Sequence, residues 1–269
     1  MLHERIFLDP CDDRVYIDTY VADEKRRKRP AMLVIPGGGY SQVCTDREGE
    51  PIAIAFMAKG YNAFVLNYRV NGETYPAQLI DASRAIAHIR DNADKYAIDE
   101  TKVYAVGFSA GGHLAGSLAI MHNEPEVLRA LGIKEGDNRP DAAILAYPVV
   151  SAVVKSTHIG SFERLLGKPA ADATEEELRY LSLDCRANEK SAPLFIWHTE
   201  RDQAVAPDGS FALAQRYTDL SIPCMFHLYP YGPHGVALAN EITLTDNPGV
   251  IQPLAEGWVN TAVEWFKTL

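Results

Sequence analysis

Short apolar runs rich in β-branched and aromatic residues alternate with helical patterns from residue 31 onward. The runs span residues 31–35, 62–66, 103–108, 142–147, 194–197 and 225–229. Their continuous apolar character is typical of strands covered on both faces, as in a parallel sheet, rather than of half-exposed strands. Repeated strand–helix–strand units imply right-handed crossovers. The pattern therefore predicts an α/β protein built on an open, mainly parallel sheet with helices on both faces.

Two more strand-like runs, residues 5–8 and 15–21, precede this alternation. The second alternates apolar and polar residues through Val15, Ile17 and Tyr20. Such alternation indicates a strand with one solvent-facing side. We therefore predict that the two runs form a leading antiparallel pair.

Helices are expected between the strands. The sequence Thr45-Asp46-Arg47-Glu48 has the spacing of a capping box and predicts a helix to about residue 59, where Gly60 ends it. Pro76 begins the next helix, and further helices are expected at residues 110–121, 211–220 and 254–266. The apolar stripe of the Pro76 helix consists of Leu79, Ala82, Ile86, Ile89 and Ala93. In the last helix, Trp258 and Trp265 lie seven residues apart, which favours core packing over a ligand role.

One connection is unusually long. It separates the run that ends at residue 147 from the run that begins at residue 194, and it includes a second capping-box pattern from Thr174 to Glu177. Insertions of this length in α/β sheets usually lie above the carboxyl ends of the strands. We expect residues 151–190 to form a short lid or pocket wall within a single domain spanning residues 1–269.

Composition and charge narrow the possible partners. The chain has 269 residues and a formal net charge of -10, which disfavours phosphate backbones and anionic lipids. The basic run at residues 25–29 is interpreted as a solvated loop. No apolar segment is long enough to cross a membrane, and the four scattered cysteines favour reduced thiols. We expect a cytoplasmic protein that acts on a small molecule, without nucleic acid, membrane, metal or cofactor; a homo-oligomer stays possible.

The stretch VGFSAGGHL places Ser109 between a buried strand and a helix. A tight turn there strains the backbone of the serine, and small neighbours at Gly107 and Gly111 leave room for close strand-to-helix approach. This arrangement is a nucleophile elbow, which projects the hydroxyl from the carboxyl edge of the sheet. The bare G-x-S-x-G pattern is weak evidence, but its position after a strand and before a helix strengthens it.

A serine nucleophile needs a base and a group that orients the base. Asp202 follows the strand at 194–197, and His234 follows the strand at 225–229, which gives the chain order Ser, Asp, His. Glu200 and Asp208 are alternatives for the acid. Among the other histidines, His113, His198 and His227 are interpreted as packing or supporting residues, and His3, His88, His122 and His158 lack a companion motif.

The glycines of Pro36-Gly37-Gly38-Gly39-Tyr40 follow the strand at 31–35. Backbone N–H groups without side chains in the way suit the binding of a negatively charged oxygen. The stretch is similar to the HGGG loop of lipases and esterases, with Pro36 in place of the histidine. It lacks the spacing of a phosphate-binding loop.

Over nearly its whole length, the chain resembles the α/β-hydrolases. More narrowly, PGGGY, DREGEPIA, GFSAGGHLA, WHT before Asp202, and GPHGVAL resemble small bacterial acetylxylan or sugar esterases. The resemblance implies an eight-stranded sheet with its second strand antiparallel. It also implies Ser109 as nucleophile, with Asp202 and His234 as its partners. The oxyanion donors that it implies are the backbone amides of Gly38, Gly39 and Ala110.

The expected function is that of a serine carboxylesterase. It would cleave short-chain acyl esters, with O-acetyl groups on carbohydrates as the favoured substrates, through an acyl-serine intermediate. Kynurenine formamidases have a similar elbow, so an arylformamidase-like amide hydrolase is an alternative. A non-catalytic ligand-binding homologue is another, because a fold alone does not assign a function.

Overall fold

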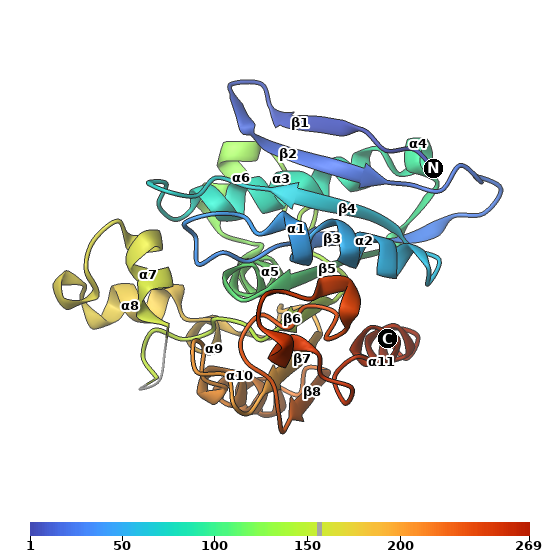
Figure 1. Cartoon of the computed structure of the whole chain (residues 1–269). Helices are drawn as coiled ribbons and strands as arrows, with labels where there is room; N and C mark the ends of the chain where they lie inside the picture. Colours follow the sequence, from blue (N-terminus) through green and yellow to red (C-terminus); the bar gives the residue numbers. More distant parts are fainter. Residues whose placement is uncertain (155–157) are drawn as a thin grey trace.

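The computed structural model, which describes residues 1–154 and 158–269, holds eight strands in one sheet of order β1-β2-β4-β3-β5-β6-β7-β8 (Figure 1). Strand β2 runs antiparallel to β1 and β4, and the other neighbouring strands are parallel. The mainly parallel sheet, the leading antiparallel pair and the antiparallel second strand are therefore confirmed. The strands are β1 (Arg5–Asp9), β2 (Asp12–Tyr20), β3 (Arg29–Ile35), β4 (Asn62–Asn67), β5 (Ile98–Phe108), β6 (Ala143–Ala146), β7 (Leu194–Thr199) and β8 (Cys224–Tyr229).

Helices cover both faces of the sheet, as the apolar strands require. Strand β3 shows why: Leu33 and Ile35 face one buried cluster, whereas Met32 and Val34 face the other. The first cluster includes side chains of α3 (Ala77–Asp91), α5 (Ala110–Met121), α9 (Leu183–Arg186) and α10 (Asp208–Asp219). The second includes side chains of α2 (Glu50–Met57) and α11 (Trp258–Phe266). Burial on two faces stabilises the central strands more than one face could.

The helix expected at residues 45–59 is wrong in detail. It is divided at Gly49 into α1 (Thr45–Glu48) and α2, and α2 ends at Met57. Thr45 is the first helical residue rather than a cap, and the capping position, Cys44, makes no side-chain capping bond. Glu48 cannot serve a capping box because its side chain turns into the protein, where it is 2% exposed.

Other helix boundaries differ by a few residues. Helix α3 ends before Ala93, which begins the separate α4 (Ala93–Tyr96). Helix α10 begins directly after Pro207, earlier than expected. Helix α11 begins only at Trp258, because Leu254 lies in the preceding turns, 65% exposed. Both Trp258 and Trp265 are buried in the core, as predicted. Helix α6 (Pro125–Leu131) was not predicted from the apolar pattern.

The long connection before β7 contains α7 (Ile159–Leu166), a 3-10 turn (Ala170–Asp172), α8 (Glu175–Leu181) and α9. In Figure 1, α7 and α8 project beyond the end of the sheet. The second capping box is confirmed: Thr174 accepts a bond from the Glu177 amide, and the Glu177 carboxylate accepts one from the Thr174 amide. Residues 155–157, within the expected 151–190 insertion, lie outside the described residues. Two 3-10 turns, Glu241–Thr243 and Pro248–Val250, precede α11.

Two surface expectations can be compared with the structure. In the basic run, residues 25–28 are exposed, while Arg29 begins β3 and is partly buried. None of the helices in residues 1–154 and 158–269 combines the length and apolar character that a membrane crossing requires.

Candidate active site

Ser109 lies at a sharp turn between β5 and α5. Its backbone has φ 54° and ψ -117°, a strained conformation for a residue with a side chain. The two expected glycines are sterically required, because a Cβ on Gly107 would lie 2.0 Å from the Gly111 oxygen, and one on Gly111 would lie 2.2 Å from the Ile35 oxygen. The strained serine with glycines on both sides has the geometry of a nucleophile elbow.

The structure brings together the three side chains selected from the sequence. His234 Nε2 lies 2.8 Å from Ser109 Oγ, and His234 Nδ1 lies 2.6 Å from Asp202 Oδ2. Both distances are within hydrogen-bond range. Ser109 is 8% exposed and Asp202 is 4% exposed, whereas the His234 side chain is 22% exposed. Of the three side chains, the His234 imidazole is therefore the one most exposed to solvent.

Asp202 is held in place by several donors. Its Oδ1 accepts bonds from the amides of Ala204 and Val205, at 3.0 and 2.9 Å. Burial alone would raise the pKa of this carboxyl, but the hydrogen bonds from His198 and His234 outweigh burial and lower the pKa well below its usual range. Asp202 is therefore a carboxylate at neutral pH, which fixes the His234 proton on Nδ1 and leaves Nε2 able to accept the serine proton.

His198 has a closer relation to the site than the sequence indicated. It is fully buried, and its Nε2 lies 3.4 Å from Asp202 Oδ2 and 2.8 Å from the Val205 oxygen. Its supporting role agrees with the sequence interpretation, but the contact with Asp202 could not be read from a position inside a strand. The alternative acids are excluded as partners by position, because Glu200 and Asp208 are exposed and make no contact with His234.

The glycine loop after β3 presents free backbone donors. Among the hydrogen bonds of residues 1–154 and 158–269, none uses the N–H groups of Gly38, Gly39 or Ala110. The neighbouring amide of Gly37 is occupied, since it donates to Glu48 Oε2 at 2.8 Å. Unpaired amides beside a serine hydroxyl suit the stabilisation of a developing negative oxygen.

Glu48 connects this loop to the histidine loop, and sequence reasoning missed it. Its Oε1 accepts a bond from the Tyr147 hydroxyl at 2.9 Å. The same hydroxyl accepts a bond from the amide of Ala237, three residues beyond His234, at 3.0 Å. The Tyr147 ring also packs edge-on against the His234 ring, with 5.1 Å between centroids. The one signal that pointed to Glu48 was its place in the DREGEPIA stretch.

Arg47 provides a second link from the same short helix. Its Nη1 donates to the oxygen of Gly235, directly after His234, at 3.2 Å. Glu48 and Arg47 therefore fix the glycine loop and the histidine loop relative to each other. Neither side chain contacts Ser109 or His234 through a hydrogen bond, so both are positioning residues.

The insertion also reaches the glycine loop. Arg164, on α7, donates to the oxygen of Gly39 at 3.2 Å and to that of Gly160 at 2.9 Å. A Cβ on Gly39 would lie 3.8 Å from both Arg164 Nη1 and His158 Cε1. Burial, followed by the charges of His234 and Arg164, lowers the pKa of His158. His158, for which the sequence offered no motif, therefore belongs to the rim of the site.

His113 is a buried packing residue, as expected. It is 2% exposed, and its two nitrogens contact the Tyr40 hydroxyl and the Leu181 oxygen, both at 2.8 Å. Burial lowers its pKa to about 4. It thus joins α5 to the glycine loop and to the insertion as a neutral imidazole.

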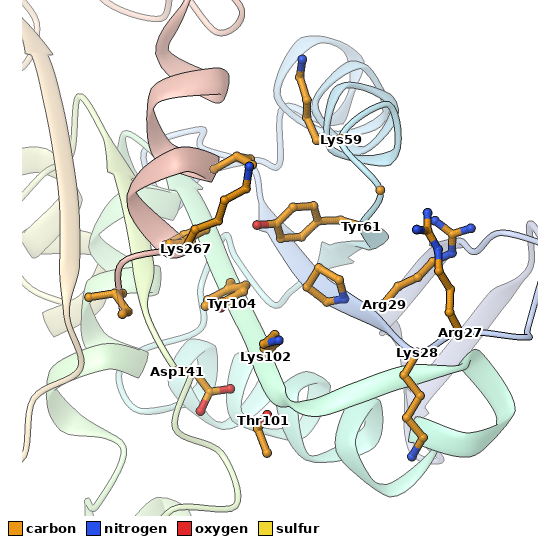
Figure 2. Close-up of a pocket in the computed structure, with 15 residues that line it drawn as sticks. Arg27, Lys28, Arg29, Lys59, Tyr61, Thr101, Lys102, Tyr104, Asp141 and Lys267 are labelled. Atoms are coloured by element: carbon orange, nitrogen blue, oxygen red, sulfur yellow. The ribbon is translucent and has the colours of Figure 1, made fainter.

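Two of the hollows that the described residues form lie in different places. A cavity of about 760 Å³ is lined by Arg27, Lys102, Tyr61 and Tyr104, among others, at the end of the sheet away from Ser109 (Figure 2). A smaller groove of about 560 Å³ includes His234 in its lining. Of these two hollows, only the smaller one is lined by a member of the Ser109–His234–Asp202 group, namely His234. Within residues 1–154 and 158–269, no group of three or more His, Cys, Asp or Glu side chains could hold a metal ion.

An eight-stranded sheet with an antiparallel second strand, and a serine at a strained turn after the fifth strand, define the class of α/β-hydrolases. The BD-FAE family model matches residues 17–217, and the chain belongs to this family. Endo-1,4-beta-xylanase B of Butyrivibrio fibrisolvens is 41% identical over 223 residues, which are 80% of this chain and 33% of that protein.

Two further relatives are named for the cleavage of acetyl esters. An acetylxylan esterase of Xylanibacter ruminicola is 27% identical over 206 residues, 76% of this chain and 40% of that protein. The structure of an acetyl ester-xyloside bifunctional hydrolase from Caldicellulosiruptor lactoaceticus superposes with a TM-score of 0.83 at 30% identity, covering 98% of this chain and 96% of that one. The chain matches well under half of the length of the two sequence relatives and nearly the whole of the solved structure.

Proposed function

We propose that the protein is a serine carboxylesterase that removes short acyl groups, acetyl in particular, from carbohydrates. The observation that carries the proposal is the His234 imidazole, which lies within hydrogen-bond distance of both Ser109 Oγ and Asp202 Oδ2. The similarity to the acetylxylan esterase and to the acetyl ester-xyloside hydrolase supports acetylated sugars as the substrate class.

The mechanism follows from the positions of the groups. Ser109 Oγ attacks the ester carbonyl carbon while His234 Nε2 accepts the serine proton, and Asp202 stabilises the imidazolium. The amides of Gly38, Gly39 and Ala110 bind the negative carbonyl oxygen, and the amino end of α5 adds a positive potential there. The C–O bond then breaks, and His234 returns the proton to the leaving alcohol.

The second half repeats these steps with water. His234 accepts a proton from water as the water oxygen attacks the acyl-serine, and the free acid leaves as the serine regains its proton. The net reaction consumes one ester and one water and yields one alcohol and one acid. No further group is needed to balance it.

Further proposals concern the insertion beside the site, the partners of the protein and its location. We propose that residues 151–190 form a pocket wall within a single domain, on the strength of the Arg164 contact with Gly39. The net charge of -10 supports the expectation of no nucleic-acid or membrane partner. The four free cysteines support the cytoplasm as the location.

The test compares the wild-type protein with Ser109→Ala on nitrophenyl acetate and on acetylated xylo-oligosaccharides. Loss of the nucleophile from such a unit costs on the order of a million-fold in kcat. Reaction of Ser109 with a fluorophosphonate, identified by peptide mass, gives an independent readout that the variant should lack. Retention of a tenth of the activity by the variant would reject the assignment. Faster hydrolysis of N-formylkynurenine than of any ester would favour the amide hydrolase instead.

A further inference from the structure

The groove beside His234 carries an unusual distribution of charge. Arg201 is the one side chain in its lining with a permanent charge, and the lining contains no carboxylate. Gln203 and Gln252 add amide groups, and Tyr231 adds an aromatic ring that is 52% exposed. The lining of the groove thus offers one cation and no acid, and the Asp202 carboxylate behind it is buried and bonded to His234.

Arg201 is also free to bind. Within residues 1–154 and 158–269, its guanidinium makes no ion pair and no hydrogen bond. It lies over the ring of Tyr231, with 4.9 Å between the guanidinium carbon and the ring centroid. Stacking on an aromatic face holds the planar fork in one orientation, so less side-chain entropy is lost when the fork binds a carboxylate.

The position of the groove indicates which half of an ester it would receive. His234 returns a proton to the leaving alcohol, so the alcohol half must lie against the imidazole during that step. An alcohol half that lies against His234 would extend along the groove that His234 lines, toward Arg201. The Tyr231 ring can contact the apolar face of a sugar, and the glutamine amides can bond hydroxyl groups.

We propose that Arg201 and Tyr231 form a subsite for a carboxylate on the alcohol half of the substrate, so that the enzyme prefers acetylated sugars near a uronic acid. This inference rests on the proposed esterase function and specifies its substrate. The Arg201 fork pairs with the carboxylate through two parallel N–H···O bonds, a geometry that a lysine could not reproduce.

The first experiment uses a matched pair of esters, 4-acetoxybenzoate and its neutral methyl ester. The wild-type protein, Arg201→Gln and Arg27→Gln are assayed for kcat/KM on both. Arg27→Gln is the matched control, because Arg27 is an exposed cation at the distant cavity (Figure 2), so it removes the same charge elsewhere. Comparing this ratio of kcat/KM values between the variants cancels the difference in intrinsic reactivity between the esters, because that difference is the same for every variant.

We expect Arg201→Gln to lower the ratio of charged to neutral ester about fivefold, the size typical of an exposed ion pair. The decrease should appear mainly in KM, and it should shrink as salt is raised to 1 M, where the screening length is about 3 Å. Arg27→Gln should keep the wild-type ratio. An equal ratio in the wild-type protein and Arg201→Gln would overturn the subsite, as would an equal decrease in both variants.

A second experiment does not depend on turnover. Binding of a xylo-oligosaccharide that carries a uronic acid, and of its neutral counterpart, is measured by calorimetry on Ser109→Ala with and without Arg201→Gln. Tighter binding of the acidic sugar that vanishes with Arg201→Gln supports the subsite, and equal binding of both sugars overturns it. If the wild-type protein cleaves neither ester, the esterase proposal fails, whereas the binding result still decides the subsite.

Discussion

Glu48 offers the sharpest test of how the site is held together. Its carboxylate, 2% exposed, accepts the Gly37 amide at 2.8 Å and the Tyr147 hydroxyl at 2.9 Å. Glu48→Ala removes both acceptors and leaves two buried donors unpaired. Each such donor costs about 1–3 kcal/mol, so the free energy of unfolding should fall by about 3 kcal/mol or more. Water entering the space would lower the loss but could not restore the geometry.

The substitution Glu48→Gln removes the negative charge of the side chain but keeps one oxygen that can accept a hydrogen bond. The amide oxygen can still accept the Gly37 N–H, whereas the amide nitrogen meets the Tyr147 hydroxyl, which must turn its hydrogen elsewhere. We therefore expect a loss of about 1 kcal/mol, one unmade bond. Glu50→Ala is the control, because Glu50 is an exposed acid two residues away.

The assays are urea unfolding followed by circular dichroism, and kcat and KM on nitrophenyl acetate. Because the glycine amides would stabilise charge that develops only in the transition state, kcat should fall more than KM rises. A Glu48→Ala protein within about 0.5 kcal/mol of the wild type, the usual range of surface changes, would refute the argument. Equal losses in Glu48→Ala and Glu48→Gln would show that the charge matters rather than the acceptor.

Two further predictions concern Asp202 and His113. Asp202→Asn should lower kcat about 10⁴-fold at neutral pH, as in other triads where the wrong imidazole tautomer is favoured, and a loss under tenfold would contradict the role of Asp202. His113 has a pKa of about 4 when folded and 6.5 as the reference value, so on acidification the unfolded chain gains a proton that the folded chain lacks. The free energy of unfolding should fall between pH 6.5 and 4, by on the order of 3 kcal/mol. His113→Gln should show a smaller fall in urea unfolding, and an unchanged pH dependence would argue against the buried neutral imidazole.

Much of the fold could be predicted from the sequence because strands and the turn at Ser109 depend on residues close together in the chain. Most of the parallel strands contain a continuous apolar run, as in the last six residues of β5, and Gly107 and Gly111 flank Ser109 closely enough to predict the turn. The order of Ser109, Asp202 and His234 along the chain then predicted which loops meet, because parallel strands end at one edge of the sheet. Their contacts at 2.8 and 2.6 Å agree with that prediction.

The supporting residues were not readable, because their roles depend on distant contacts. His158 belongs to the site because it lies near Gly39, which is distant in the sequence. His198 contacts Asp202 because the loop after β7 folds back onto that strand. The pattern Thr-x-x-Glu shows that one local pattern can have two structural outcomes. It occurs at Thr45 and at Thr174. The pattern at Thr174 forms a capping box on an exposed helix end. In the pattern at Thr45 the glutamate, Glu48, is buried and forms no capping box.

The difference between the two patterns has an energetic cause. Helix α1 spans four residues, too few to be stable by its own hydrogen bonds. It is held because Arg47 binds the Gly235 oxygen and Glu48 binds the Gly37 amide and the Tyr147 hydroxyl. Those loops are in turn fixed by the same two side chains, so helix and site form together. Changes in Arg47 or Glu48 must therefore alter stability and turnover in parallel, a coupling that local helix propensity cannot express.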